Sequence, residues 1–316
     1  MATAVKVGKE GTHGTVASTF TSVPCNFSSV LRQANKVLEE DRQGQDRHFQ
    51  MVKGQAYNEW EVSDSGIYHD TIGFWLYSAF GAPTKTVVDT IFDNSFKFTD
   101  DPTSISLQWQ QPRRYTQAYQ ALYGVVDQFG VSFSAEGELT YSASGLAMAE
   151  TEITTITHSW STARPMPVWG ATVLWNNGAF TKLVSGSISV SRNRKPFWVL
   201  NNSQSPGSMN IGARTVEVEL VLDFVAKTEY DSFKTASILS TSNKGLQIKW
   251  VDAGVTIGTT SSPEFELTAG SMAYETAEID TGGDLPLLKI NGKAVYNATN
   301  ATSLECRVRS SKDYTA

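Results

Sequence analysis

Carboxylate side chains recur at every second position in two segments of the sequence, and this spacing is the first feature that could support chemistry. In residues 212–224, GARTVEVELVLDF, apolar side chains fall on one side of an extended chain and acidic ones on the other. Residues 54–65 show a similar pattern. The acidic positions of the two segments are Glu59, Glu61, Glu217, Glu219 and Asp223. Each segment is therefore predicted to be a strand with one buried face and one acidic face.

Two carboxylates on one strand face could act as the acid and the base of a glycosidase. Residues two apart on a strand point the same way at about 7 Å, a separation that such pairs use. A solvated face of a half-buried strand is far commoner than a catalytic pair. The sequence therefore favours an acidic surface over a catalytic site.

Other catalytic and cofactor signatures are absent from the sequence. The four histidines are scattered, with no HExxH motif and no second histidine at metal-ligand spacing. The glycines of GKEGTHG (8–14) match neither GxGxxG nor the phosphate-binding loop. Cys25 and Cys306 stand in unrelated contexts, without a partner at metal-ligand spacing. We expect no enzymatic activity, no cofactor and no metal site.

The overall composition is that of an ordinary globular protein with an acidic balance. The 316 residues suit one large or two ordinary domains, and 40% hydrophobic residues suffice for packed cores. A formal charge of -6 argues against a protein that grips nucleic acid by neutralising phosphates. No apolar run resembles a signal peptide or reaches the roughly 20 residues needed to span a bilayer. We expect a protein that is made in the cytoplasm and does not contact a membrane.

Most of the chain is predicted to form strands. Five segments alternate and are rich in β-branched and aromatic residues. They are SISLQW (104–109), FGVSFSA (129–135), GSISVS (186–191), LQIKW (246–250) and EFELTA (264–269). Asn291-Gly292 is a strong two-residue hairpin signal, and Glu136-Gly137 and Asn193-Arg194 are weaker ones. In strands of this kind, Trp60, Trp109 and Trp250 fall on apolar positions and are predicted to lie in the core.

Two segments have the spacing of short helices. The first contains Ile72 to Phe80, with Asp70 as a cap and Gly81 as the stop signal. The second runs from Thr228 to Ile238. Residues 28–40 also have helical spacing but stand where a strand would be expected, so their structure stays open.

A weak internal repeat relates the two halves of the chain. Residues 54–65 align without a gap to residues 212–223, at an offset of 158 residues (212 minus 54), which is half of 316. A short helix and then a strand that ends in tryptophan follow each copy. Residues 147–165 are rich in Thr, Ser and Ala and have the composition of a connector. We expect a first module with an N-terminal arm over 1–160 and a second module with a C-terminal extension over 161–316.

Basic residues form small groups at predicted strand ends. Because the whole chain is acidic, contacts with acidic patches of a neighbouring copy suit these groups better than DNA binding. The candidate interface residues are Arg113, Arg114, Arg192, Arg194, Lys195, Arg307 and Arg309.

The order of these features resembles that of the major tail tube protein of long-tailed, non-contractile phages, in the version whose tube module occurs twice. The segments that carry the resemblance are GKEGTHGT (8–15), FTSVPCNFSSVLRQ (20–33), residues 54–81, residues 102–145 and residues 181–207. The resemblance implies a mainly β fold of two tandem β-sandwich or barrel modules with one short helix each. It also implies rings that stack into a hollow virion tail tube, other tail proteins at the tube ends, and no enzymatic activity.

Under this resemblance, the acidic strands would line a channel through which double-stranded DNA passes without adhering. In the opposite register, the same carboxylates would lie on the outer wall and keep the tail soluble. If each chain carries two modules, three chains complete a ring with pseudo-six-fold symmetry, whereas six are needed if the second half is a decoration. The long segment 83–103 and both chain ends would then reach the next ring.

Two other classes of protein fit the same composition. One is a carbohydrate-binding or receptor-binding β-sandwich protein, which would also be β-rich and well supplied with tryptophan. The other is a different phage structural subunit, such as a tail terminator or a capsid decoration protein.

Overall fold

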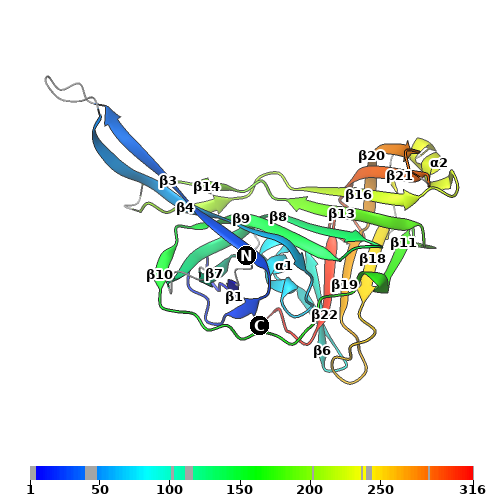
Figure 1. Ribbon diagram of the computed structural model, residues 1–316, viewed down its shortest axis with the longest axis horizontal. Helices are drawn as coiled ribbons and strands as arrows, with labels where there is room; N and C mark the ends of the chain where they lie inside the picture. The colour runs from blue at the N-terminus through cyan, green and yellow to red at the C-terminus, as the bar shows by residue number, and fades with distance from the viewer. Residues whose placement is uncertain are drawn as a thin grey trace.

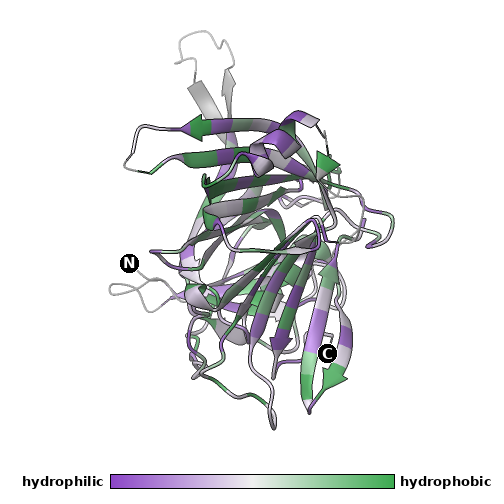
Figure 2. Ribbon diagram, turned by 90° about the vertical axis from the view of Figure 1, so that its right-hand side faces the viewer, coloured by the Kyte–Doolittle hydropathy of each residue, from purple (hydrophilic) through white to green (hydrophobic). Residues whose placement is uncertain are grey.

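The computed structural model describes residues 5–39, 48–100, 103–110, 117–200, 203–235, 238–239, 244–283 and 285–315. This part of the chain is mainly β, with two short α-helices, and is organised in two layers (Figure 1). A long ribbon of the two strands β3 and β4 projects from them. In Figure 2 strands carry alternating hydrophilic and hydrophobic bands, as expected where one face is buried. The predicted fold class is confirmed.

An eight-stranded antiparallel sheet forms one layer. Its edge strands are β3 (Asn26–Glu39) and β20 (Ser271–Asp280), and the two-residue β17 (Ile238–Leu239) pairs with part of β20. The strands between these edges are, in order, β4 (His48–Gly66), β9 (Thr140–Met148), β8 (Ala118–Ser134), β13 (Leu183–Ser191), β16 (Thr215–Asp223) and β21 (Leu287–Val295). Every neighbouring pair is antiparallel, so the two edge strands run in opposite directions.

The strand order of this sheet repeats. The β3–β4 pair is followed by α1 (Ile72–Phe80), and the later β8–β9 pair returns to place β9 against β4. The β13–β16 pair is followed by α2 (Thr228–Thr235), and the later β20–β21 pair returns to place β21 against β16. Strand β8 pairs with β13 and joins the two sets of four. The repeated order agrees with the offset between β4 and β16.

The second layer draws strands from both halves of the chain. A seven-stranded sheet has the order β12 (Gly178–Phe180), β11 (Ala171–Trp175), β18 (Leu246–Val251), β19 (Glu264–Ala269), β22 (Glu305–Ser310), β6 (Ile91–Lys97) and β5 (Thr84–Val88). The first half of β8 pairs with β7 (Ile105–Gln110) and with β10 (Thr151–Ile153). Strand β7 in turn pairs with β1 (Val5–Lys9), and β1 pairs with β2 (Thr21–Val23). Because β6 pairs with β22, the seven-stranded sheet crosses residue 160. The module boundary there stays a prediction.

Two smaller elements complete the fold. Strands β14 (Lys195–Phe197) and β15 (Ser208–Asn210) form a two-stranded arm between β13 and β16. The backbone amide of Ala56 on β4 donates a hydrogen bond to Gln204 in this arm, at 2.8 Å. A 3-10 turn, η1 (Val168–Gly170), precedes β11.

The core lies between the two layers and around α1. Almost every residue of α1 is buried, and Trp75 stacks on Trp60 of β4 and donates a hydrogen bond to the hydroxyl of Tyr141 at 2.9 Å. Trp250 on β18 packs against Phe133 on β8 of the eight-stranded sheet and against Phe265 on the neighbouring strand β19. The predicted core positions of Trp60, Trp109 and Trp250 are confirmed, since all three are buried.

The helix boundaries agree with the sequence except at one cap. Helix α1 begins after Thr71 rather than after Asp70, and no side chain caps it. Gly81 ends it at a φ of 124°, which favours glycine. Helix α2 begins at Thr228, as expected, and ends at Thr235. Residues 28–39, which the sequence left open, belong to strand β3.

The strongest predicted hairpin turn is wrong. Asn291 and Gly292 lie in the middle of β21, with strands paired on both sides. A Cβ on Gly292 would lie 2.4 Å from the carbonyl oxygen of Ala273, so glycine is needed here for the close approach of β20. Asn193-Arg194 is also not a tight hairpin turn, because the β14–β15 arm follows it. Glu136-Gly137 lies between the paired strands β8 and β9, as predicted, but in a connection over residues 135–139 rather than in a two-residue turn.

The last described residues return to α1. Tyr314 is fully buried, its hydroxyl donates a hydrogen bond to the carbonyl of His69 at 3.0 Å, and its ring lies edge-on to Phe74. A Cβ on Gly73 would lie 2.5 Å from the Tyr314 ring, so only glycine allows this contact. Residues after β22 therefore fasten the second half of the chain to the helix of the first half.

We expect Tyr314→Ala to lower the free energy of unfolding by about 3–5 kcal/mol, the usual cost of truncating a buried aromatic ring. Urea unfolding monitored by tryptophan fluorescence measures this loss. Thr315→Ala, at an exposed neighbouring position, is the matched control and should change the midpoint little. Equal midpoints for the two variants would contradict the contact.

Candidate functional site

One face of the eight-stranded sheet is not covered by the second layer. On β16 the residues Thr215, Glu217, Glu219, Val221 and Asp223 point to this face, while the alternate residues are buried. On β4 the exposed acidic positions have the same relation to the buried Trp60 and Val62. The register carries this face from strand to strand across the sheet. The five predicted carboxylates thus lie on one continuous surface, called here the open face.

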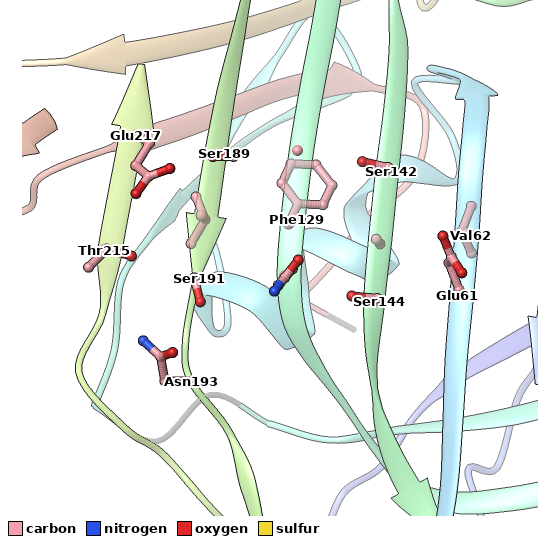
Figure 3. Close-up of a pocket in the computed structure, with 14 residues that line it drawn as sticks. Glu61, Val62, Phe129, Ser142, Ser144, Ser189, Ser191, Asn193, Thr215 and Glu217 are labelled. Atoms are coloured by element: carbon pink, nitrogen blue, oxygen red, sulfur yellow. The ribbon is translucent and has the colours of Figure 1, made fainter. Parts of the chain in front are cut away.

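The middle of the open face is lined by hydroxyl groups. Strand pairing aligns Ser144, Gln128 and Ser191 in one row. It aligns Ser142, Gly130 and Ser189 in the next. These rows floor a shallow hollow of about 460 Å³ that has Glu61 on one side and Glu217 on the other (Figure 3). The centre of the open face therefore carries small polar side chains, and both of its flanks are acidic.

Sequence reasoning missed this hydroxyl surface. Its signal was present in SGSISVS (185–191) and YSASG (141–145), where serine alternates with buried residues. The serine-rich strands β9 and β13 are distant in the sequence, and only their pairing with β8 shows that the serines lie on either side of one hollow.

Three basic residues of the open face are held in ion pairs. Nη2 of Arg32 on β3 lies 2.8 Å from Oε2 of Glu59. Nζ of Lys289 on β21 lies 2.7 Å from Oδ2 of Asp280. Lys293, also on β21, pairs with Glu275 on β20. The side-chain hydrogen bond from Lys289 and the amide of Gly282 lower the pKa of Asp280, and the same pairing raises the pKa of Lys289.

Nothing about the open face resembles a catalytic centre. Glu59 and Glu61, like Glu217 and Glu219, stand on an exposed sheet surface rather than in an enclosed cleft. Among the described residues, no group of three His, Cys, Asp or Glu side chains could hold a metal ion. No helix in that part of the chain is long and apolar enough to span a membrane.

Two of the predicted interface arginines lie inside the subunit. Arg192 is 1% exposed and donates a hydrogen bond to the carbonyl of Thr99 at 3.0 Å. Arg194 is 6% exposed and donates to the carbonyl of Val126 at 3.0 Å. Both guanidinium groups bind carbonyl groups of the first half of the chain and so hold the two halves together. The proposed subunit interface therefore does not include Arg192 and Arg194.

The other predicted interface residues have different placements. Arg113 and Arg114 lie outside the described residues, and Lys195 is exposed at the start of the β14–β15 arm. Arg307 and Arg309 lie on the outer surface of the seven-stranded sheet and both contact Asp93, at 2.6 and 3.3 Å. Arg307 also approaches Glu266, and Arg309 pairs with Glu264. Their charges are balanced within the chain, and a role in subunit contacts stays a prediction for these two and for Lys195.

The segment 83–103 was expected to reach the next ring. Its described part forms the β5–β6 hairpin, whose turn is attached to its own chain. Oδ2 of Asp89 in this turn accepts hydrogen bonds from the amides of Thr259 and Thr260, at 3.1 and 2.6 Å. This turn is therefore held against the subunit body.

Beneath α1, His69 is a buried histidine between the two layers. Its Nδ1 lies 3.2 Å from Oγ of Ser310 on β22. Burial lowers the pKa of the imidazole below its ordinary value of 6.5, and Asp70 and Asp252 oppose this effect. The folded protein therefore favours neutral His69, whereas the unfolded chain takes up a proton near pH 6.5.

We expect the free energy of unfolding to fall as the pH is lowered below about 6.5, because the unfolded state then binds the extra proton. The His69 contribution at pH 5.5 is at most about 1.4 kcal/mol. Urea unfolding of the natural protein and of His69→Gln between pH 7.5 and 5.5 measures it. The variant should show a flatter pH dependence, and parallel curves would contradict the buried neutral histidine.

A comparison with known protein families decides the class of the molecule. The family model described as phage tail tube protein matches residues 2–302, nearly the whole chain. The chain belongs to the phage tail tube protein family. No curated protein sequence matches it. Membership makes this tail tube protein a structural component of the virion tail that associates with itself into a tube and contacts other tail proteins. The resemblance inferred from the sequence is thereby confirmed at the level of the family.

Proposed function

We propose that this tail tube protein forms stacked rings whose channel is lined by the open face, and that DNA passes along this face without binding. One observation carries the proposal. All five carboxylates predicted from the sequence lie on a single uncovered sheet surface. The cations Arg32, Lys289 and Lys293 on this surface are each paired with a carboxylate. The protein acts as a conduit and not as an enzyme.

Ring closure follows from the edges of the sheet. The edges β3 and β20 run in opposite directions, because each chain contributes an even number of antiparallel strands. When copies join by rotation about one axis, β20 of one copy therefore meets β3 of the next as an antiparallel pair. Eight strands from each of three chains would close a twenty-four-stranded barrel, and this closure would satisfy the backbone groups that an open edge leaves unpaired.

The repeated strand order supports three chains per ring. Each set of four strands, with its helix, would occupy one sixth of the circle, which gives pseudo-six-fold symmetry to a trimer. This arrangement is that of a duplicated tube module in a tail of the long, non-contractile type. The subunits would be made in the host cytoplasm and assembled there into tails.

The β3–β4 ribbon and the β14–β15 arm are candidates for the contacts between stacked rings. The β3–β4 ribbon extends well beyond the body at one end, with β14 near its base (Figure 1). Val52 on the ribbon and Val199 and Leu200 on the β14–β15 arm are exposed apolar side chains. Contact with the next ring would bury them, which favours association.

DNA would pass through the channel because the channel wall has little affinity for it. Double-stranded DNA carries one negative charge per roughly 1.7 Å of axis, and free cations on the wall would act as binding sites. Carboxylates repel phosphates within a Debye length of about 8 Å at physiological salt. The hydroxyl rows between them are uncharged and small. DNA would therefore slide along a hydrated wall that offers no strong contact.

Negative-stain electron microscopy of the purified protein at high concentration tests this function. Hollow tubes or stacked rings with three-fold symmetry are the expected result. Rings of six chains would retain the conduit but contradict the duplicated module. A protein that stays monomeric under all conditions, or that binds an oligosaccharide array, would contradict the proposed function.

A further inference from the structure

Cations are rare on the body of the open face, and each has a carboxylate partner. The body consists of residues 26–35, 54–66, 118–134, 140–148, 183–191, 215–223, 271–280 and 287–295. Its basic residues are Arg32, Lys289 and Lys293. We propose that Asp280 and Glu275 hold the two lysines as neutral pairs and so prevent them from binding the phosphates of passing DNA. The inference rests on the proposed function, which places this face on the channel.

The geometry of β20 supports this role for Glu275. The register between β20 and β21 shifts between Tyr274 and Thr276, so Glu275 is an extra residue in the edge strand. A β-bulge of this kind redirects a side chain. The redirected carboxylate pairs with Lys293, whose backbone is aligned with Ala273. Burial of the pair is slight, so solvent screens it and its effect on stability is small.

Asp280 is fixed at the other end of β20. Its Oδ1 accepts a hydrogen bond from the amide of Gly282 at 3.0 Å, and its Oδ2 accepts one from Nζ of Lys289 at 2.7 Å. Lys289 is aligned with Glu278, so a second carboxylate lies beside it. The carboxylate of Asp280 is therefore positioned before DNA arrives.

The two lysines stabilise the sheet by opposing the carboxylates of the neighbouring strands. Lys293 is aligned with Glu217 across the β16–β21 pair, and opposite charges on facing positions stabilise strand pairing. Without lysines, β16 and β20 would bring six carboxylates to the two sides of β21 with no counter-charge. The ion pairs thus let β21 carry two cations for the sheet without offering free ammonium groups to phosphate.

DNA binding by the purified, unassembled full-length protein tests the inference, with a fluorescent 20-base-pair duplex as the probe. Asp280→Asn and Glu275→Gln should each increase the affinity. Each freed lysine should add about one released counterion, which is roughly a 3.5-fold fall in affinity between 50 and 200 mM salt. The double variants Asp280→Asn/Lys289→Gln and Glu275→Gln/Lys293→Gln should return to the natural affinity.

Glu305→Gln is the matched control. It makes the same charge change and frees Lys97, which lies 3.6 Å from Glu305 on the seven-stranded sheet. If Asp280→Asn and Glu275→Gln gain no more affinity and salt dependence than Glu305→Gln, the inference is overturned. Phage particles carrying the variants separate it from the proposed function. Higher DNA affinity of the subunit with an unchanged rate of DNA release supports the neutral pairs and contradicts the channel position of the open face.

Discussion

Tubes that carry Glu217→Lys and Glu219→Lys are expected to assemble normally but to release DNA at least about tenfold more slowly. Both side chains are exposed on β16. Glu217 faces Lys293 across the β16–β21 pair, so the lysine variant places like charges opposite each other at an exposed position, at a cost of about 0.2–1 kcal/mol. Their loss should therefore cost little stability. Two new phosphate contacts per chain should steepen the salt dependence, so that the DNA affinity they add falls roughly tenfold between 50 and 200 mM salt.

The rate of DNA release from purified particles, triggered in vitro and followed with a DNA-binding dye, measures this effect. Glu217→Gln with Glu219→Gln is the control, because it removes the negative charges without adding cations and should slow release far less. The lysine variant should also recover speed at higher salt, since its contacts are screened. An unchanged release rate at low salt would show that these side chains do not face the channel.

Ring formation is expected to be lost when a proline blocks the free edge of β3. Successive backbone amides of a strand point to opposite sides, so of two adjacent residues one donates towards β4 and the other towards the open edge. Val30 and Leu31 are adjacent and both are exposed, so their side chains contribute little to the core. Of the variants Val30→Pro and Leu31→Pro, one should fold and stay monomeric, because its missing amide is at the open edge.

The other proline variant should lose stability instead, because it removes a hydrogen bond between β3 and β4. Light scattering coupled to size exclusion measures the association state, and urea unfolding measures the stability of each variant. Val30→Ala and Leu31→Ala keep the amides and should form rings. Ring formation by both proline variants would contradict edge-to-edge closure.

The acidic face could be predicted from the sequence because its signal is local. A period of two in residues 215–223 defines both faces of a strand wherever that strand lies. The residues that alternate with Glu217 and Glu219 on this strand are all apolar and buried. The same logic placed Trp250 in the core. It could not place β3, since Val30 and Leu31 are both exposed at an edge and no clean alternation marks its faces.

Long-range contacts account for the errors. Asn291-Gly292 has the chemistry of a turn, but Gly292 is required by the carbonyl of Ala273 on the neighbouring strand. Arg192 and Arg194 read as surface cations, yet they satisfy the carbonyls of Thr99 and Val126, which are far away in the sequence. Such buried charges need partners that only the fold provides. The hydroxyl rows were missed for the same reason, because they exist only in the register of three strands.

An electron cryo-microscopy reconstruction of the assembled tube, at a resolution that shows side chains, tests the central claim most directly. We predict that Glu61, Ser189 and Glu217 face the channel and that β20 of each chain pairs with β3 of the next. A channel lined by the seven-stranded sheet, or β3 and β20 edges left unpaired between neighbouring chains, would contradict the account.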